Sequence, residues 1–190
     1  MATPAFPGAD KLIAAIDAAV ALPDEHAIAH SLRDTLCAMI RDRDVRLPDY
    51  IYEPVGDHYA RRELYSSDTH GYSVVAMTWG PGQGTQIHDH CGMWCVEGVW
   101  HGALEITQYQ LLESTDDRAR FAAAGSMQAG TGSAGSLIPP HEYHTIRNPS
   151  ADAIAVSLHI YKGTMKACSV FQPRADGWFE RETRHLGLDR

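Results

Sequence analysis

The strongest constraint on the fold is a change of sequence pattern near residue 50. Before it, apolar residues recur at helical spacing. After it, short β-branched and aromatic runs alternate with glycine, proline and other turn residues. The runs are "YSVVAMTW", "GALEITQY", "GSLIPP" and "AIAVSLHIY". Such short, separated strands predict an antiparallel barrel or sandwich. The stretch "FAAAGSMQAGTGSAGS" is rich in small residues, and we expect it to be a variable connection between strands.

The part of the chain before the β-rich runs predicts two α-helices. The first, "DKLIAAIDAAVAL", should end before Pro23, and Asp24 suits the N-cap of the second. Apolar residues at helical spacing mark one face of each helix: Leu12, Ile13, Ile16 and Val20 in the first, and Ile28, Leu32, Leu36, Met39 and Ile40 in the second. We expect both helices to pack on the outside of the β unit.

Length and composition indicate an ordinary globular protein. A chain of 190 residues favours one domain, and 44% hydrophobic and 21% charged residues fit that class. The net charge of −8, without a long basic run, argues against nucleic acid as a partner. No apolar run approaches the roughly 20 residues of a membrane helix, and no secretion signal is visible, so we expect a cytoplasmic protein with its four cysteines reduced. The sequence does not indicate an oligomeric state.

A pair of histidines follows a glycine-rich segment in "GQGTQIHDHCGMWC", residues 82–95. Side chains at i and i+2 of a strand point to the same face. His88 and His90 can therefore aim at one point while Asp89 turns away. An isolated pair of this kind also occurs as two surface histidines, so its surroundings decide between the two interpretations.

Those surroundings resemble the two motifs of the cupin superfamily. The spacing Gly-x5-His-x-His-x4-Cys-x6-Gly is followed by Pro-x4-His-x3-Asn, ending at Asn148. The resemblance implies a small double-stranded β-helix, or jelly-roll barrel, with a metal held in its mouth by His88, His90 and His144. His141 is the alternative third ligand, although the spacing to Asn148 favours His144.

The sequence departs from the cupin pattern in three places. Cys95 occupies the position of the usual glutamate ligand, and His141 and Ser133 stand where glycines are expected. Glu97 lies two positions too late to replace the missing glutamate. The resemblance therefore implies a site of three neutral imidazoles, which suits a divalent metal with open positions for an anionic ligand. Zinc and iron both fit such a donor set.

The run "AVSLHIY", residues 155–161, sorts into two faces when read as a strand. Its apolar face carries Val156, Leu158 and Ile160. The other face carries a polar row of Ser157, His159 and Tyr161. Such a row either lines a functional site or forms a solvated outer face.

Together these features resemble the cysteine dioxygenase family of thiol dioxygenases, which includes bacterial 3-mercaptopropionate dioxygenases. The resemblance rests on Cys95 in the glutamate position, the three histidines, and the Ser-x-His-x-Tyr pattern. It implies that Ser157, His159 and Tyr161 form a hydrogen-bonded relay beside iron. It also implies that Cys95 is a partner of Tyr161, joined to its ring by a thioether, rather than a ligand.

The segment "YARREL", residues 59–64, extends the resemblance. In the family's Tyr-x-Arg stretch the arginine binds the substrate carboxylate, which implies that role for Arg61 and a pocket-lining role for Tyr59. The alternative is that Arg61 and Arg62 are surface charges. We expect this of one of the two, since neighbours on a strand face opposite ways.

We expect a single cupin domain over residues 1–190, with N-terminal helices (1–47), a β-barrel core (50–172) and a C-terminal extension (173–190). The resemblance covers about residues 50–172. It implies one Fe(II) per chain and oxidation of L-cysteine to cysteine sulfinic acid with O2. The alternatives are the same chemistry on 3-mercaptopropionate or mercaptosuccinate, since Trp94 and "KGT" after Tyr161 depart from the animal enzymes. A non-redox metal cupin, such as a zinc or manganese isomerase, and a metal-free binding cupin also stay open.

Overall fold

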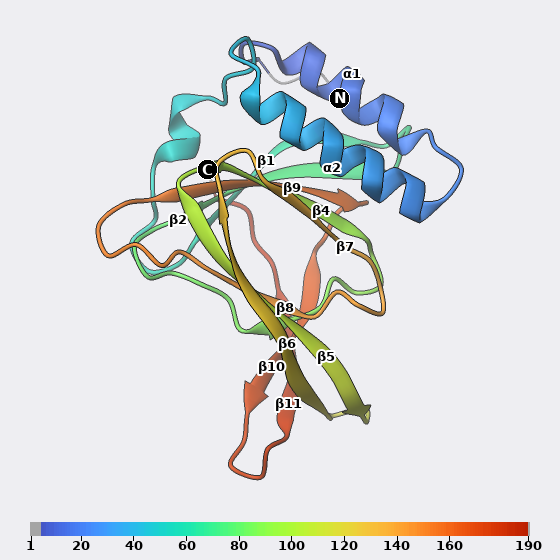
Figure 1. The fold of residues 1–190 in the computed structure, drawn as a ribbon, viewed down its shortest axis with the longest axis vertical. Coiled ribbons are helices and arrows are strands. Elements are labelled where there is room, and N and C mark those ends of the chain that lie inside the picture. Colours follow the sequence, from blue (N-terminus) through green and yellow to red (C-terminus); the bar gives the residue numbers. More distant parts are fainter. Residues whose placement is uncertain (1–4, 190) are drawn as a thin grey trace.

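The computed structural model describes residues 5–189. Helices α1 (Ala9–Val20) and α2 (Glu25–Arg41) come first, followed by the 3-10 turn η1 (Asp49–Tyr52). The strands are β1 (Ala60–Ser67), β2 (Tyr72–Trp79), β3 (Ile87–His88), β4 (Cys95–His101), β5 (Ala103–Ser114), β6 (Arg118–Gly130), β7 (Ala134–Leu137), β8 (His144–Arg147), β9 (Ala155–Lys162), β10 (Ala167–Pro173) and β11 (Phe179–His185). Figure 1 shows the two helices lying over one face of the β structure.

The strands form two groups. A five-stranded sheet has the order β1-β2-β9-β4-β7, and a closed ring has the order β10-β11-β6-β5-β8-β3. The pairs between these strands are antiparallel. This mostly β architecture with two N-terminal helices confirms the predicted cupin fold. Residues beyond 172 contribute to it, because β11 pairs with both β10 and β6.

Helix α2 lies directly on the five-stranded sheet. Its side chains Leu32 and Leu36 are fully buried in a cluster with Leu158 and Ile160 of β9. The contact is close enough that a Cβ at Gly98 of β4 would meet Ile40 Cδ1 at 2.9 Å, so only glycine fits without displacement. The helix begins where expected, since the Asp24 side chain accepts a hydrogen bond from the Ala27 amide over 2.9 Å.

Strand β9 separates the helix layer from the barrel interior. The polar row of Ser157, His159 and Tyr161 faces inward and is only 2–3% exposed. The interpretation of this row as a solvated outer face is therefore wrong. The row lies next to β4, where the register pairs Cys95 with Tyr161 and Glu97 with His159.

The small-residue stretch predicted to be a connection forms part of β6 and the start of β7 instead. Strand β6 pairs with β5 along a long hairpin, most of whose outer half is solvent-exposed. Alanine, glycine and serine have low intrinsic strand preference, but continuous cross-strand pairing overrides it. Figure 1 shows this hairpin extending away from the helices. Within residues 5–189, no helix is long and apolar enough to cross a membrane.

Candidate metal centre

Three histidines from two segments, residues 88–90 and strand β8, converge in the barrel. Their potential ligand atoms lie within 4.8 Å of one another. His88 of β3 pairs directly with His144 of β8, with ring centroids 4.3 Å apart. The ring of His90, just after β3, lies 5.4 Å from that of His88 and 5.1 Å from that of His144. These three histidines form a group that could hold a metal ion.

Backbone carbonyls orient two of these rings. His144 Nδ1 lies 2.7 Å from the carbonyl oxygen of Glu142, and His88 Nδ1 lies 3.1 Å from that of Gln86. A carbonyl oxygen only accepts hydrogen bonds, so each Nδ1 carries the proton and each Nε2 keeps its lone pair. Among the described residues, the buried His144 Nε2 and His90 Nδ1 have no hydrogen-bond partner. Unpartnered ring nitrogens are what a metal site requires.

Burial also keeps the three histidines neutral. It lowers the pKa of His88 and holds the pKa of His90 and of His144 well below the ordinary value of 6.5. Metal binding needs the unprotonated imidazole, so no proton has to be displaced near neutral pH. Three imidazoles suit zinc, iron, copper and nickel alike. The donor set therefore fits a divalent transition metal without selecting one.

His141, the alternative third ligand, lies outside this group. It is exposed in the turn before β8, where its amide donates to the carbonyl oxygen of Ile138. His144, three residues later, is completely buried. The geometry favours His144 because the direct pairing of β8 with β3 places it opposite His88.

The polar row of β9 forms a hydrogen-bonded chain that starts at Trp79. The indole Nε1 of Trp79 donates to Ser157 Oγ over 2.8 Å, and Ser157 Oγ lies 2.7 Å from His159 Nε2. The hydroxyl group of Tyr161 lies 3.4 Å from His159 Nδ1. Because the Ser157 oxygen already accepts from Trp79, its own hydrogen is free for His159 Nε2. With that hydrogen directed at Nε2, the ring proton of His159 would lie on Nδ1, facing Tyr161.

Cys95 lies beside this chain. It is fully buried and directly opposite Tyr161 across the β4–β9 pair, and its Sγ lies 4.0 Å from His159 Nδ1. Burial raises the pKa of the Cys95 thiol and of the Tyr161 phenol well above their ordinary values. Both groups are therefore protonated near neutral pH. Cys91, which directly follows His90, is exposed.

Glu97 is a site residue that the sequence reasoning missed. Its Oε2 atom lies 3.3 Å from His159 Nδ1 and 3.9 Å from His144 Nε2. That oxygen is buried and has no hydrogen-bond partner among the described residues, and burial raises the pKa of the carboxyl group to about 8. The spacing to Cys95 could have predicted this position, because Glu97 is two residues after Cys95 and alternate residues of a strand share a face.

Arg61 and Tyr59 line the same pocket as the three histidines. Arg61 is 6% exposed, and its Nη1 donates to the carbonyl oxygen of Gly187 over 2.9 Å. Tyr59 stacks on Trp79 with ring centroids 4.5 Å apart. The pocket has a free volume of only about 20 Å³, which is of the order of one or two water molecules.

The expectation that one of the two neighbouring arginines is a surface charge is wrong. Arg62 is 5% exposed and faces away from the pocket. There its Nη2 donates to the carbonyl oxygen of Glu53 over 2.9 Å, and its Nη1 donates to Thr78 Oγ1 over 3.3 Å. The segment around η1 covers the outer side of β1, so both sides of this strand are buried.

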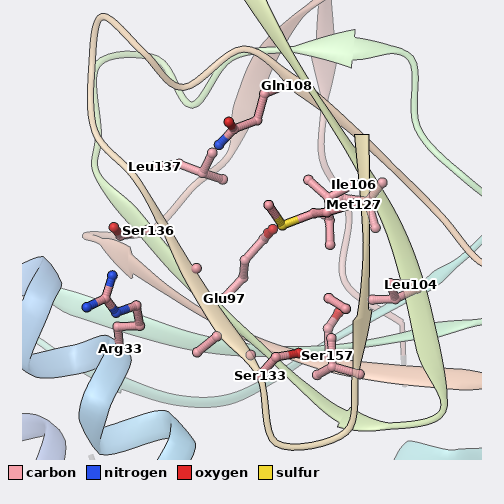
Figure 2. A pocket seen from close by; sticks show the side chains of 16 residues that line it. Arg33, Glu97, Leu104, Ile106, Gln108, Met127, Ser133, Ser136, Leu137 and Ser157 are labelled. Atoms are coloured by element: carbon pink, nitrogen blue, oxygen red, sulfur yellow. The ribbon is translucent and has the colours of Figure 1, made fainter. Parts of the chain in front are cut away.

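A second, larger cavity of about 280 Å³ lies on the other side of Glu97. Figure 2 shows the Glu97 side chain reaching into it, with Ile106 and Met127 across the space and Arg33 of α2 at its edge. Its walls are mostly apolar. Glu97 and Ser157 line this lateral cavity and also belong to the group of side chains around His159. These side chains therefore separate it from the metal centre.

A cupin barrel with three converging histidines defines a metal-binding type of cupin. Residues 55–174 match the family model described as "Cysteine dioxygenase type I". The chain belongs to this family, as the sequence predicted.

The curated relatives are distant. The chain is 22% identical over 132 residues to cysteine dioxygenase type 1 of Rattus norvegicus, covering 65% of this chain and 61% of that protein. It is 25% identical over 118 residues to the Danio rerio protein of the same name, covering 60% of this chain and 56% of that protein. The chain thus spans less than two thirds of the length of these relatives.

Among solved structures, one similar protein is a conserved protein with a double-stranded β-helix domain from Klebsiella pneumoniae. The two are 15% identical, the match covers 65% of this chain and 88% of that one, and the TM-score is 0.49.

Proposed function

We propose that the protein is a thiol dioxygenase that uses one Fe(II) per chain to oxidise the thiol of a small thiol carboxylate to a sulfinic acid. The observation that carries this proposal is the shared pocket. The three histidines, the Tyr161 end of the Trp79–Tyr161 hydrogen-bonded chain, and the buried Arg61 all line one small space. Membership of the cysteine dioxygenase type I family supports the reaction class.

The reaction balances without an external reductant, since R–SH and O2 combine to R–SO2H and both oxygen atoms enter the product. When bound, iron supplies the positions at which a thiolate and dioxygen meet. His88, His90 and His144 would hold it as neutral ligands. The absence of a charged carboxylate among these three leaves the site attractive to an anionic thiolate.

Arg61 would bind the substrate carboxylate. A guanidinium forms paired, charge-assisted hydrogen bonds with a carboxylate. The Arg61 side chain reaches the pocket from β1 and the histidines reach it from β3 and β8, so a bound molecule would have its carboxylate held by Arg61 and its thiol held at the metal. Tyr59 would close one wall through its stacking on Trp79.

Tyr161 would donate a hydrogen bond to the substrate carboxylate or to the oxygen being transferred. Its phenol keeps its proton at neutral pH because burial raises the pKa. His159 lies between Ser157 and Tyr161, so it would orient the phenol, while Ser157 and Trp79 hold the imidazole in place. We propose the roles of all three β9 residues on this arrangement.

We also propose that Cys95 becomes joined to Tyr161 through a thioether. The thiol S–H and one ring C–H would be lost as a carbon–sulfur bond forms, with O2 accepting the two electrons and two protons. The cross-strand pairing of the two residues supports this proposal. The link would hold the phenol ring in one orientation without creating a metal ligand.

We propose L-cysteine as the first substrate to test, because the chain belongs to the cysteine dioxygenase type I family. 3-Mercaptopropionate and mercaptosuccinate are the competing thiol carboxylates. The test is oxygen uptake by protein loaded with Fe(II) under nitrogen, using these three thiols and cysteamine, with zinc-loaded protein as the control. We expect one O2 consumed per thiol and two labelled oxygens in the sulfinate from ¹⁸O2. Iron binding without oxygen uptake on any thiol would refute the proposal.

A further inference from the structure

Residues 186–189, called here the strap, run from the wall of the metal pocket to Arg61 of β1. The strap is fixed on both sides. The Leu186 amide donates to the carbonyl oxygen of Lys166, just before β10, over 2.9 Å. The Asp189 amide donates to the carbonyl oxygen of Arg61 over 2.7 Å. Leu186 itself lines the pocket, and the hydrogen bonds between Asp189 and Arg61 place the other end of the strap beside β1.

The strap holds Arg61 at three atoms. In addition to the bond to the Arg61 carbonyl, Asp189 Oδ2 accepts from the Arg61 backbone amide over 2.8 Å, and the Gly187 carbonyl oxygen accepts from Arg61 Nη1 over 2.9 Å. Among residues 5–189, the other guanidinium nitrogens of Arg61 have no protein hydrogen-bond partner. One side of the guanidinium is thus bound by the strap, and the rest is left for a ligand in the pocket.

The Asp189 carboxylate is itself held in place from outside. Its Oδ1 lies 3.0 Å from His58 Nε2, and His58 Nδ1 lies 2.6 Å from Asp57 Oδ1. Asp189 therefore links an exposed histidine to the backbone of the buried arginine. Both carboxylate oxygens of Asp189 therefore make contacts within the protein.

We propose that the strap is a positioning element for carboxylate recognition, and that Asp189 acts through Arg61. The inference rests on the proposed role of Arg61 as the carboxylate-binding residue. With the strap in place, the guanidinium is held ready and loses little freedom when a carboxylate binds. Without the Asp189 contacts, the strap and the Arg61 side chain become mobile, and each binding event must order them again. The strap thereby selects for thiols that carry a carboxylate.

The experiment compares Asp189→Ala with the exposed acidic control Glu182→Ala on neighbouring β11. Asp189→Ala should raise KM for L-cysteine and 3-mercaptopropionate roughly 10-fold, the size expected for losing one charge-assisted hydrogen bond. Its kcat should change little, and cysteamine, which lacks a carboxylate, should keep its KM. Asp189→Asn should recover part of the loss, because the amide oxygen still accepts from the Arg61 amide.

A binding measurement makes the test independent of turnover. Under nitrogen, calorimetric titration with 3-mercaptopropionate should show a roughly 10-fold higher Kd for Asp189→Ala and an unchanged Kd for Glu182→Ala. His58→Gln keeps the strap but alters its outer contact at an exposed residue, and it should raise the Kd about 2- to 3-fold. This variant tests the inference if Asp189→Ala does not fold.

The outcomes separate the two proposals. If binding depends on Asp189 while the unmodified protein oxidises no thiol, the strap inference stands and the dioxygenase proposal fails. If the unmodified protein oxidises thiols but Asp189→Ala and His58→Gln bind 3-mercaptopropionate as tightly as it does, the strap inference is overturned. Equal losses for cysteamine and for the thiol carboxylates would also overturn it, since they indicate a general structural effect. Failure of the unmodified protein to bind 3-mercaptopropionate or cysteine would overturn the carboxylate site and the strap inference together.

Discussion

Trp79 and Ser157 are joined by a hydrogen bond of 2.8 Å in which the indole Nε1–H donates to the hydroxyl oxygen. Both side chains are buried, on adjacent strands β2 and β9. This contact places the Ser157 hydroxyl between Trp79 and His159, whose Nε2 lies 2.7 Å from Ser157 Oγ. Trp79 also carries the stacked ring of Tyr59. One tryptophan therefore supports both the hydrogen-bonded chain and a wall of the pocket.

The first prediction concerns the indole N–H of Trp79, which donates to Ser157. Trp79→Phe keeps an aromatic ring against Tyr59 but leaves Ser157 free to point its hydrogen elsewhere. We expect a loss of about 1–3 kcal/mol in the free energy of unfolding and a roughly 5- to 10-fold lower kcat, with metal content unchanged. Urea unfolding, steady-state kinetics and metal analysis measure these effects. Trp178→Phe, outside the pocket, is the matched control. Equal kcat values for the two variants would exclude a role for the Trp79 donor.

The second prediction concerns the metal ligands. His144→Ala should lose most of its bound iron and its activity, because it removes one of three converging ring nitrogens. His141→Ala changes an exposed ring in the adjacent turn and should retain both. Iron per chain, measured by elemental analysis after loading and gel filtration, decides between them. Full iron occupancy in His144→Ala would show that the assignment is mistaken.

The third prediction separates the two neighbouring arginines. Arg61→Ala should reduce kcat/KM for thiol carboxylates by roughly 30- to several-thousand-fold, corresponding to about 2–5 kcal/mol for truncating one partner of a buried charge pair. Cysteamine should be affected little. Arg61→Gln should retain more activity on 3-mercaptopropionate than on cysteine, since an amide still donates one hydrogen bond.

Arg62→Ala is the control for that prediction. Its contacts with Glu53 and Thr78 lie outside the pocket, so this change should lower the free energy of unfolding while the preference among thiols stays the same. A change of substrate preference in Arg62→Ala, with none in Arg61→Ala, would exchange the roles of the two residues.

The fourth prediction concerns the thioether. After turnover, peptide mapping should find a fraction of the chains with Cys95 and Tyr161 in one linked peptide, about two mass units below the sum of its parts. Cys95→Ala should lower kcat without abolishing activity, because the phenol and the metal ligands are still present. Cys37→Ala, which changes a cysteine of α2, should neither prevent the linked peptide from forming nor lower kcat. Unlinked peptides after many turnovers would refute the crosslink but leave the dioxygenase proposal standing.

The fifth prediction is a pH dependence of stability. Burial lowers the pKa of His159 from 6.5 to about 3. Below pH 6.5 the unfolded chain protonates this histidine and the folded protein does not, so the free energy of unfolding falls as pH falls toward 3. One such proton contributes a slope of about 1.4 kcal/mol per pH unit.

His159→Gln removes that contribution. Urea unfolding of the metal-free protein between about pH 5.5 and 4 should therefore show a slope shallower by about 1.4 kcal/mol per pH unit. An identical slope in His159→Gln and the unmodified protein would mean that His159 is protonated in the folded state.

Periodicity was sufficient to predict much of the barrel. The run at 72–79 coincides with β2, and alternation along 155–161 separated the two faces of β9 correctly. Spacing also brought together His88, His90 and His144, because the cupin motifs encode which strands meet. Alternation along a strand and the spacing of a motif are both contained in a single sequence, so these features can be predicted from it.

Other features depend on what covers a strand, which no local pattern contains. Both arginines of β1 are buried because η1 packs on the outer side and the strap on the inner side. Strand β6 forms despite weak strand preference because β5 pairs with it. Glu97 was considered only as a substitute ligand, and its approach to His159 follows from the β4–β9 register.

Strand β3 is only two residues long, and its neighbours in the ring are β10 and β8, far along the chain. His88 therefore cannot face His144 until segments separated by more than fifty residues have met. Contacts of this kind cost the most loop-closure entropy and favour slow folding. A metal probe bound by the three histidines should thus appear only when the ring has closed. The rate at which it appears during refolding would time that event separately from the formation of α1 and α2.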